Sequence, residues 1–111
     1  MSRLATSFWV AAYRARLEAA GLPAYVTAKG DATAGAVLVK VATLDGNATL
    51  WQRSVDLLTG ERAWVVLTEG GETDVDSAIQ RQRSFDPDLW VIEVESRDGR
   101  HLLDEAGLAD G

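Results

Sequence analysis

The sequence predicts an α+β fold, in which helices pack on a mixed five-stranded sheet. Three observations lead to this class. A helical pattern opens the chain, short apolar runs separated by turn residues fill its middle, and a second helical pattern precedes the last apolar run. The middle runs predict an antiparallel meander, and the last run completes one β-α-β unit. The chain has 111 residues, which fits one globular domain over residues 1–111.

The first helix is expected from about Arg3 to Ala20. At 100° per residue, its charged side chains share a narrow arc and its large apolar side chains fill most of the remainder. This wide apolar arc predicts deep burial. Gly21 and Pro23 then end the helix. Arg16 falls inside the apolar arc, where a snorkelling or ion-paired arginine is favoured over an anion-binding one.

Five apolar runs predict strands. Asp45 and Gly46 form a typical hairpin signal between the second and third strands, and a Thr-Gly-Glu turn separates the third from the fourth. Residues 64–67 of the fourth strand are all apolar, which indicates that both of its faces are covered. Helices on both faces of the sheet would give three α/β/α layers. The alternative is a sheet with one face exposed to solvent. The expected strands span residues 24–28, 36–44, 48–57, 63–67 and 89–95.

The second helical pattern covers residues 70–85, where apolar side chains recur three and four positions apart. Thr73 and Asp76 have the spacing of a capping box. The crossover is long enough for the last strand to return parallel to the fourth. Beyond about residue 104, the sequence has the character of a loose end.

Composition argues against several classes of function. A net charge of -6 disfavours nucleic-acid binding, and the absence of cysteine removes disulfides, thiolate metal sites and cysteine nucleophiles. No apolar run approaches the roughly 20 residues that cross a bilayer. We therefore expect a cytoplasmic protein that binds no nucleic acid, membrane, metal or cofactor.

Charge is distributed unevenly along the chain. Residues 1–55 carry six basic and three acidic groups, a net of +3, whereas residues 56–111 carry five basic and fourteen acidic groups, a net of -9. The two halves can neutralise each other when they pack together. The same asymmetry also favours self-association.

Gly30 and Gly35 have the spacing of the two glycines in a phosphate-binding loop. Here the chain continues into a strand, and the lysine and hydroxyl residues that should follow the second glycine are missing. We expect no helix N-terminus to face this loop, and we interpret its glycines as a need for unusual backbone angles. Lys29, Asp31 and Thr33 remain candidates for binding a small anion, together with the only other lysine, Lys40.

Other reactive arrangements have little support. His101 is the sole histidine, so it forms no multi-histidine metal site, and no serine motif frames it as part of a triad. Trp51 and Arg53 share one face of the third strand. An exposed Trp–Arg pair is typical of protein contacts, so both are candidate binding residues.

Four segments resemble the bacterial domain-of-unknown-function family 1491. They are GDATAGAVLVKV, RSVDLLTGERAWVVLTEG, IQRQRSFDPDLWVIEVE and GRHLLDE. They follow one another in order over nearly the whole chain. The resemblance implies a compact cytoplasmic domain with helices and a mixed sheet, and it implies no activity and no site residues.

The residues thus favour a non-catalytic binding or protein-interaction module. Its partner would be a second copy, in a homodimer, or another protein. The alternative is an enzyme or sensor that binds a small anionic metabolite through the loop of residues 29–35.

Overall fold

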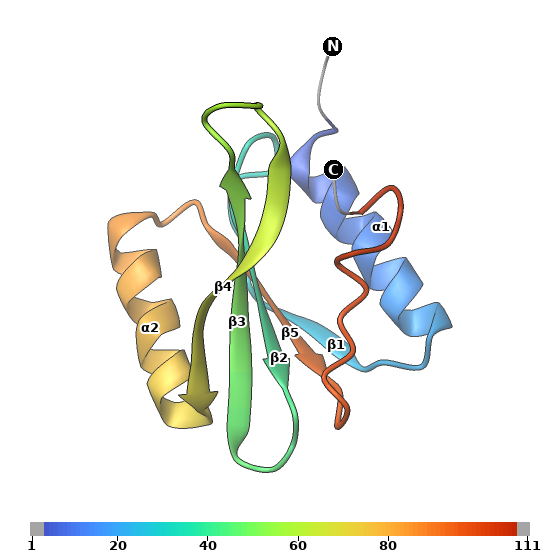
Figure 1. The fold of residues 1–111 in the computed structure, drawn as a ribbon, viewed down its shortest axis with the longest axis vertical. Helices are drawn as coiled ribbons and strands as arrows, with labels where there is room; N and C mark the ends of the chain where they lie inside the picture. The colour runs from blue at the N-terminus through green and yellow to red at the C-terminus, as the bar shows by residue number, and fades with distance from the viewer. Residues whose placement is uncertain (1–3, 109–111) are drawn as a thin grey trace.

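The computed structural model describes residues 4–108, in which two helices flank a five-stranded mixed sheet (Figure 1). The α+β class is therefore confirmed. No helix within residues 4–108 is long and apolar enough to cross a membrane. The elements are α1 (Thr6–Ala19), β1 (Ala24–Ala28), β2 (Val37–Ala42), β3 (Asn47–Val55), β4 (Arg62–Gly71), α2 (Glu72–Phe85) and β5 (Trp90–Glu95).

The strand order is β1-β5-β2-β3-β4. Strands β2, β3 and β4 form the expected antiparallel meander. Strand β5 lies between β1 and β2, antiparallel to the first and parallel to the second. It therefore runs parallel to β4, as expected for the β-α-β crossover, although β2 and β3 separate the two strands.

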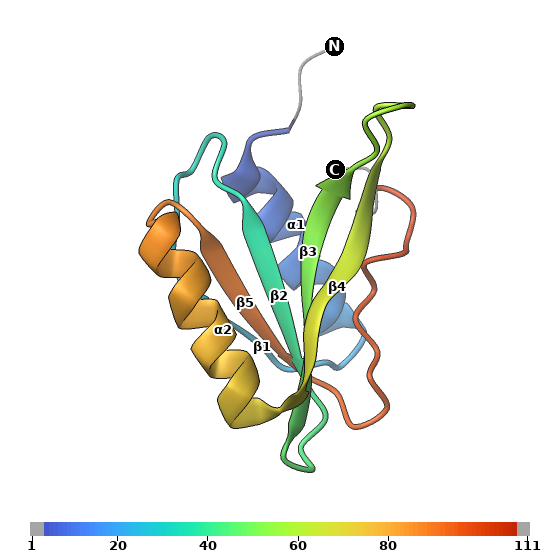
Figure 2. The same ribbon diagram turned by 60° about the vertical axis from the view of Figure 1, so that its left-hand side comes forward.

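The two helices cover opposite faces of the sheet, which gives the three-layer α/β/α arrangement (Figure 2). Neighbouring residues of a strand point to opposite faces, so β2 contributes to both cores. Val39 joins Tyr13 and Leu17 of α1 in the larger core. Leu38 joins Val75 of α2 in the smaller one.

Strand β4 lies at the edge of the sheet, and each of its faces is covered only in part, by the packing of Trp64 into the α1-side core and of Leu67 into the α2-side core. Val65 and Val66 are 37% and 43% exposed. The pairing of β3 with β4 shifts register between Leu50 and Trp51. The shift leaves Leu67 without a register partner, so the alternation of β4 is interrupted between Val66 and Thr68.

Both helix starts differ from expectation. Helix α1 begins at Thr6, and the expected start at Arg3 lies outside the described residues. Helix α2 begins at Glu72 after Gly71, without a hydrogen bond from any capping side chain, so the capping box is not formed. The carboxylate of Asp76 binds Lys40 instead.

The segment after β5 runs back over α1 and is packed through Leu108, contrary to the loose end expected from about residue 104. Leu103 and Leu108 are both 1% exposed in the core beneath α1. Arg16 Nη1 donates a hydrogen bond of 2.8 Å to the Ala106 carbonyl and lies 3.6 Å from Glu105 Oε1. The ion-paired interpretation of Arg16 is confirmed, because this arginine fastens the segment to the helix.

Lys40 lies in β2 on the α2 face of the sheet and is only 3% exposed. Its Nζ lies 2.7 Å from Asp76 Oδ1, 3.0 Å from Glu72 Oε2 and 3.2 Å from Glu93 Oε1. Burial opposes its charge, but hydrogen bonds to the three carboxylates outweigh burial and raise the pKa of Lys40. The ammonium thus stays charged and fully engaged, and Lys40 does not join an anion site at the loop of residues 29–35.

Replacement of Lys40 by methionine tests this ion cluster. Because Lys40→Met leaves three carboxylates close together without their cation, we expect it to lower the free energy of unfolding by about 3 kcal/mol at neutral pH. Chemical denaturation followed by tryptophan fluorescence measures this loss. Lys29→Met is the matched control, since Lys29 is exposed. Equal stability of the two variants would contradict a structural role for the cluster.

The raised pKa also fixes the pH range of this stabilisation. The folded state binds the Lys40 proton more tightly than the unfolded state does. The stabilisation is therefore complete below the ordinary lysine pKa, and it is lost as the pH rises through the folded value.

Candidate functional site

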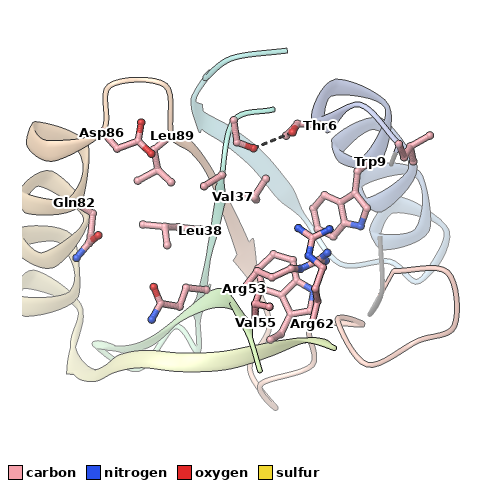
Figure 3. A pocket seen from close by; sticks show the side chains of 15 residues that line it. Thr6, Trp9, Val37, Leu38, Arg53, Val55, Arg62, Gln82, Asp86 and Leu89 are labelled. Atoms are coloured by element: carbon pink, nitrogen blue, oxygen red, sulfur yellow. Dashed lines mark hydrogen bonds between the residues drawn. The ribbon is translucent and has the colours of Figure 1, made fainter. Parts of the chain in front are cut away.

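A cleft of about 300 Å³ opens at the end of the sheet where β3 turns into β4 (Figure 3). All three layers contribute to its walls. Val37 and Leu38 of β2 lie between the walls, Trp9 of α1 lies on one side, and Gln82 and Asp86 lie on the opposite side, at the end of α2. The third wall is the β3–β4 hairpin.

Arg53 of the hairpin wall lies against two tryptophans, Trp64 of the same hairpin and Trp9 of α1. Arg53 of β3 lies directly opposite Trp64 of β4 in the strand register. Its guanidinium carbon is 4.6 Å from the Trp64 ring centroid and 5.7 Å from that of Trp9. Arg53 Nη2 and Trp9 Nε1 both donate hydrogen bonds of 3.2 Å to the Leu108 carbonyl. Cation–π contact and these hydrogen bonds hold the guanidinium group in place.

Arg62 adds a second guanidinium group to the same wall, opposite Val55 in the hairpin. The residues that line the cleft include these two arginines and one acid, Asp86, so their net charge is +1 in a chain of net charge -6. Trp64 Nε1 is buried, and no residue within 4–108 accepts a hydrogen bond from it. The cleft thus places positive charge beside an apolar surface.

Side chains for bond-making chemistry are scarce here. The residues that line the cleft include no histidine, cysteine, serine or lysine. Thr6 Oγ1 already donates a hydrogen bond of 2.8 Å to the Gly35 carbonyl. Within residues 4–108, no group of three or more histidine, cysteine, aspartate or glutamate side chains is placed to hold a metal ion. The arrangement suits binding of an anionic group attached to an apolar body.

The loop of residues 29–35 does face a helix N-terminus, so the expectation that no helix start lies there is wrong. Thr6 N and Ser7 N at the start of α1 donate hydrogen bonds to the carbonyls of Thr33 and Ala32, at 3.1 and 2.9 Å. These helix N–H groups are therefore occupied by the loop itself. The Asp31 carboxylate is occupied too, because it accepts hydrogen bonds from the backbone of Thr33 and Ala34.

The glycines of this loop are explained by close packing. Neither Gly30 nor Gly35 has a positive φ, so the interpretation from unusual backbone angles is wrong. A Cβ atom at Gly30 would lie 2.0 Å from the Asp88 carbonyl oxygen, and one at Gly35 would lie 2.5 Å from the same atom. The loop therefore lies directly on the turn that leads into β5.

Of the five candidate binding residues, the cleft contains only Arg53. Lys29, Asp31 and Thr33 are exposed on the loop and do not line the cleft. Trp51 shares the α1 face of the sheet with Arg53, but it is partly buried and lies against His101, with ring centroids 4.6 Å apart. The aromatic neighbours of Arg53 are other tryptophans.

Sequence reasoning missed Arg62 and Trp64. The signal for them was present, since Arg62 and Trp64 follow the turn of residues 56–61 at the same spacing at which Val55 and Arg53 precede it. Folding the hairpin about that turn brings Arg53 opposite Trp64. The same step would have assembled the whole hairpin wall.

A family model described as "Protein of unknown function (DUF1491)" matches residues 4–104. The chain belongs to the DUF1491 family. The resemblance seen in the sequence is therefore confirmed, and the family description names no activity. No curated protein matches this chain.

Solved DUF1491 structures share this fold. A crystal structure of a DUF1491 family protein from Caulobacter crescentus is 46% identical, with a TM-score of 0.84 over 93% of this chain and 97% of that one. An NMR structure of a Caulobacter crescentus DUF1491 protein is 45% identical, with a TM-score of 0.81 over 95% and 96%. The solution structure of protein Atu0922 from A. tumefaciens is 30% identical, with a TM-score of 0.73 over 86% and 87%.

His101 of this DUF1491 protein helps to pack the C-terminal segment against the rest of the fold. Its Nδ1 accepts a hydrogen bond of 2.9 Å from the backbone N–H of Leu103, and its carbonyl accepts one of 2.7 Å from the Tyr13 hydroxyl. Partial burial lowers the pKa of His101, and the nearby Asp104 carboxylate offsets this only in part. Protonation therefore opposes packing of the C-terminal segment.

Gly30→Ala tests the close packing of the loop on the turn before β5. We expect it to lower the free energy of unfolding by about 3 kcal/mol, because the new methyl group collides with backbone rather than with a flexible side chain. Gly71→Ala is the control, since its Cβ would lie an ordinary 3.8 Å from Asp74 Oδ2. Thermal unfolding of both variants measures the difference. A Gly30→Ala variant as stable as the wild type would refute the packing explanation.

His101→Asn tests the pH dependence of the C-terminal segment. A lowered folded pKa means that stability is lost as the pH falls through the ordinary histidine value of about 6.5. We expect wild-type stability to fall more steeply between about pH 7 and pH 5 than that of His101→Asn, whose amide oxygen can still accept the Leu103 hydrogen bond. Urea denaturation at each pH gives both slopes. Parallel slopes would show that His101 does not titrate in this way.

Proposed function

We propose that this DUF1491 protein is a non-catalytic, cytoplasmic protein-interaction domain. Its binding site is the cleft beside the β3–β4 hairpin, and its ligand is a protein segment that presents an apolar side chain next to a carboxylate. The observation that carries the proposal is the pair of guanidinium groups, Arg53 and Arg62, set beside the apolar residues Val37 and Leu38.

The chemistry of the cleft supports this class of ligand. A guanidinium group binds a carboxylate through two parallel hydrogen bonds, and the partly buried setting strengthens such bonds. Arginine and tryptophan are also the residues most enriched where protein contacts carry their binding energy.

The alternative is an enzyme or sensor that binds a small anion through the loop of residues 29–35, and it has weaker support. The Asp31 carboxylate accepts hydrogen bonds within its own loop, and the N–H groups of Thr6 and Ser7 donate to the same loop. Lys29 and Thr33 lie outside the cleft. A small anion would therefore find most of the donors around this loop already engaged.

Two short peptides test the proposed ligand class by NMR. The acidic peptide acetyl-Asp-Leu-Leu-amide should shift the indole resonances of Trp9 and Trp64 and the backbone resonances of Val37 and Leu38. The neutral peptide acetyl-Asn-Leu-Leu-amide should bind about tenfold more weakly, because it forfeits a charge-assisted hydrogen bond.

Arginine variants provide the controls for this titration. Arg62→Gln should remove the preference for the acidic peptide, whereas Arg97→Gln, an exposed arginine outside the cleft, should retain it. Equal binding of both peptides to the wild type would contradict the proposed role of the guanidinium groups. Shifts confined to residues 29–35 would favour the small-anion alternative.

A further inference from the structure

The turn between β3 and β4, residues 56–61, is called the hairpin tip here. It projects beyond the rest of the sheet, at the top of Figure 1. Its Leu57 and Leu58 are 95% and 96% exposed, more than any other large apolar side chain within residues 4–108. Two adjacent leucines held almost entirely in water form an apolar surface that a binding partner would cover.

The hairpin tip is a turn closed by its own hydrogen bonds, with both leucines directed outward. Asp56 N donates to the Glu61 carbonyl and Gly60 N donates to the Asp56 carbonyl, both at 2.8 Å. Asp56 Oδ1 accepts hydrogen bonds from Leu58 N at 2.8 Å and from Thr59 N at 3.3 Å. Gly60 has a φ of 73°, which glycine adopts without strain. The backbone of the tip is therefore held by hydrogen bonds while both leucine side chains stay exposed.

We propose that the hairpin tip binds the cleft of a second copy of the chain. The inference rests on the proposed function and names the partner of the same site. Residues 56–61 contain Asp56 and Glu61 and no basic group, a charge of -2, whereas the cleft has a net charge of +1. The tip thus offers leucines beside the Glu61 carboxylate and the Oδ2 atom of Asp56, whose Oδ1 is used within the turn, and this is the combination that the cleft suits.

The geometry assigns the tip to another molecule's cleft. Val55 and Arg62, at the base of the hairpin, line the chain's own cleft, whereas Leu57 and Leu58 beyond them lie in solvent. Tip and cleft occupy the same end of the sheet (Figures 1 and 3). Two copies related by a two-fold axis can therefore exchange tips at once, which closes a dimer with two identical contacts.

Sedimentation velocity over a range of protein concentrations tests the dimer. The wild type should dimerise. The double variant Leu57→Ser/Leu58→Ser should raise the dimer dissociation constant by about 30-fold or more, as should Arg62→Glu. Because the two leucines make almost no intramolecular contact, the serine variant should fold normally, and circular dichroism checks both variants.

Leu44→Asn is the matched control. Leu44 is 44% exposed in the β2–β3 turn at the opposite end of the sheet, and its φ of 64° suits asparagine. This variant should dimerise like the wild type. Equal loss of dimer in Leu44→Asn would overturn the assignment of the contact to the hairpin tip.

Mixing the two defective variants distinguishes tip exchange from other dimers. In the mixture, the intact tip of Arg62→Glu can enter the intact cleft of the serine variant, so one contact returns and a heterodimer should form. A dimer built from two tips in contact would survive Arg62→Glu, and one built by pairing of β4 edges would survive the serine changes. Either result would overturn the proposal.

The peptide titration separates failure of this inference from failure of the proposed function. A wild type that stays monomeric but binds the acidic peptide in its cleft refutes the second copy as partner and retains the binding site. A wild type that neither dimerises nor binds the peptide refutes both.

Discussion

The insertion of β5 between β1 and β2 is the constraint on which the rest of the structure depends. Because β1 and β2 both pair with β5, the loop that joins them must cross the start of that strand. The Asp88 carbonyl lies where Cβ atoms of Gly30 and Gly35 would be, so only glycine fits at this crossing. Carbonyl groups of this loop then accept hydrogen bonds from the first N–H groups of α1. This contact places Trp9 of that helix beside the hairpin.

The same insertion explains why a charged side chain is tolerated within the sheet. Lys40 lies beside Glu93 in the parallel register of β2 and β5, and its other two carboxylate partners, Glu72 and Asp76, come from α2. One ammonium therefore ties two central strands to the helix that covers them. A shift of one residue in the register would turn Lys40 toward the opposite core, so its charge penalises the wrong pairing.

Local patterns predicted most elements, because helix periodicity and turn residues act over a few positions. The position of β5 was not predictable in this way, since parallel pairing joins residues far apart in sequence. The spacing of Gly30 and Gly35 was ambiguous for the same reason: their decisive neighbour is Asp88. Arg53 could be selected as a candidate from its own strand. Arg62 and Trp64 can be recognised as neighbours of Arg53 only when the register of the hairpin is known.

The charge on the hairpin tip bears on the specificity of the proposed contact. Two exposed leucines alone would adhere to any apolar surface of suitable size. Asp56 and Glu61 flank them, and the chain as a whole carries a net charge of -6, so acidic parts of its surface repel the tip. The cleft, with Arg53 and Arg62, offers apolar area beside positive charge. The two acids therefore restrict the leucines to a basic cleft. The specificity of the contact arises from repulsion between the tip and acidic surfaces as much as from its fit to the cleft.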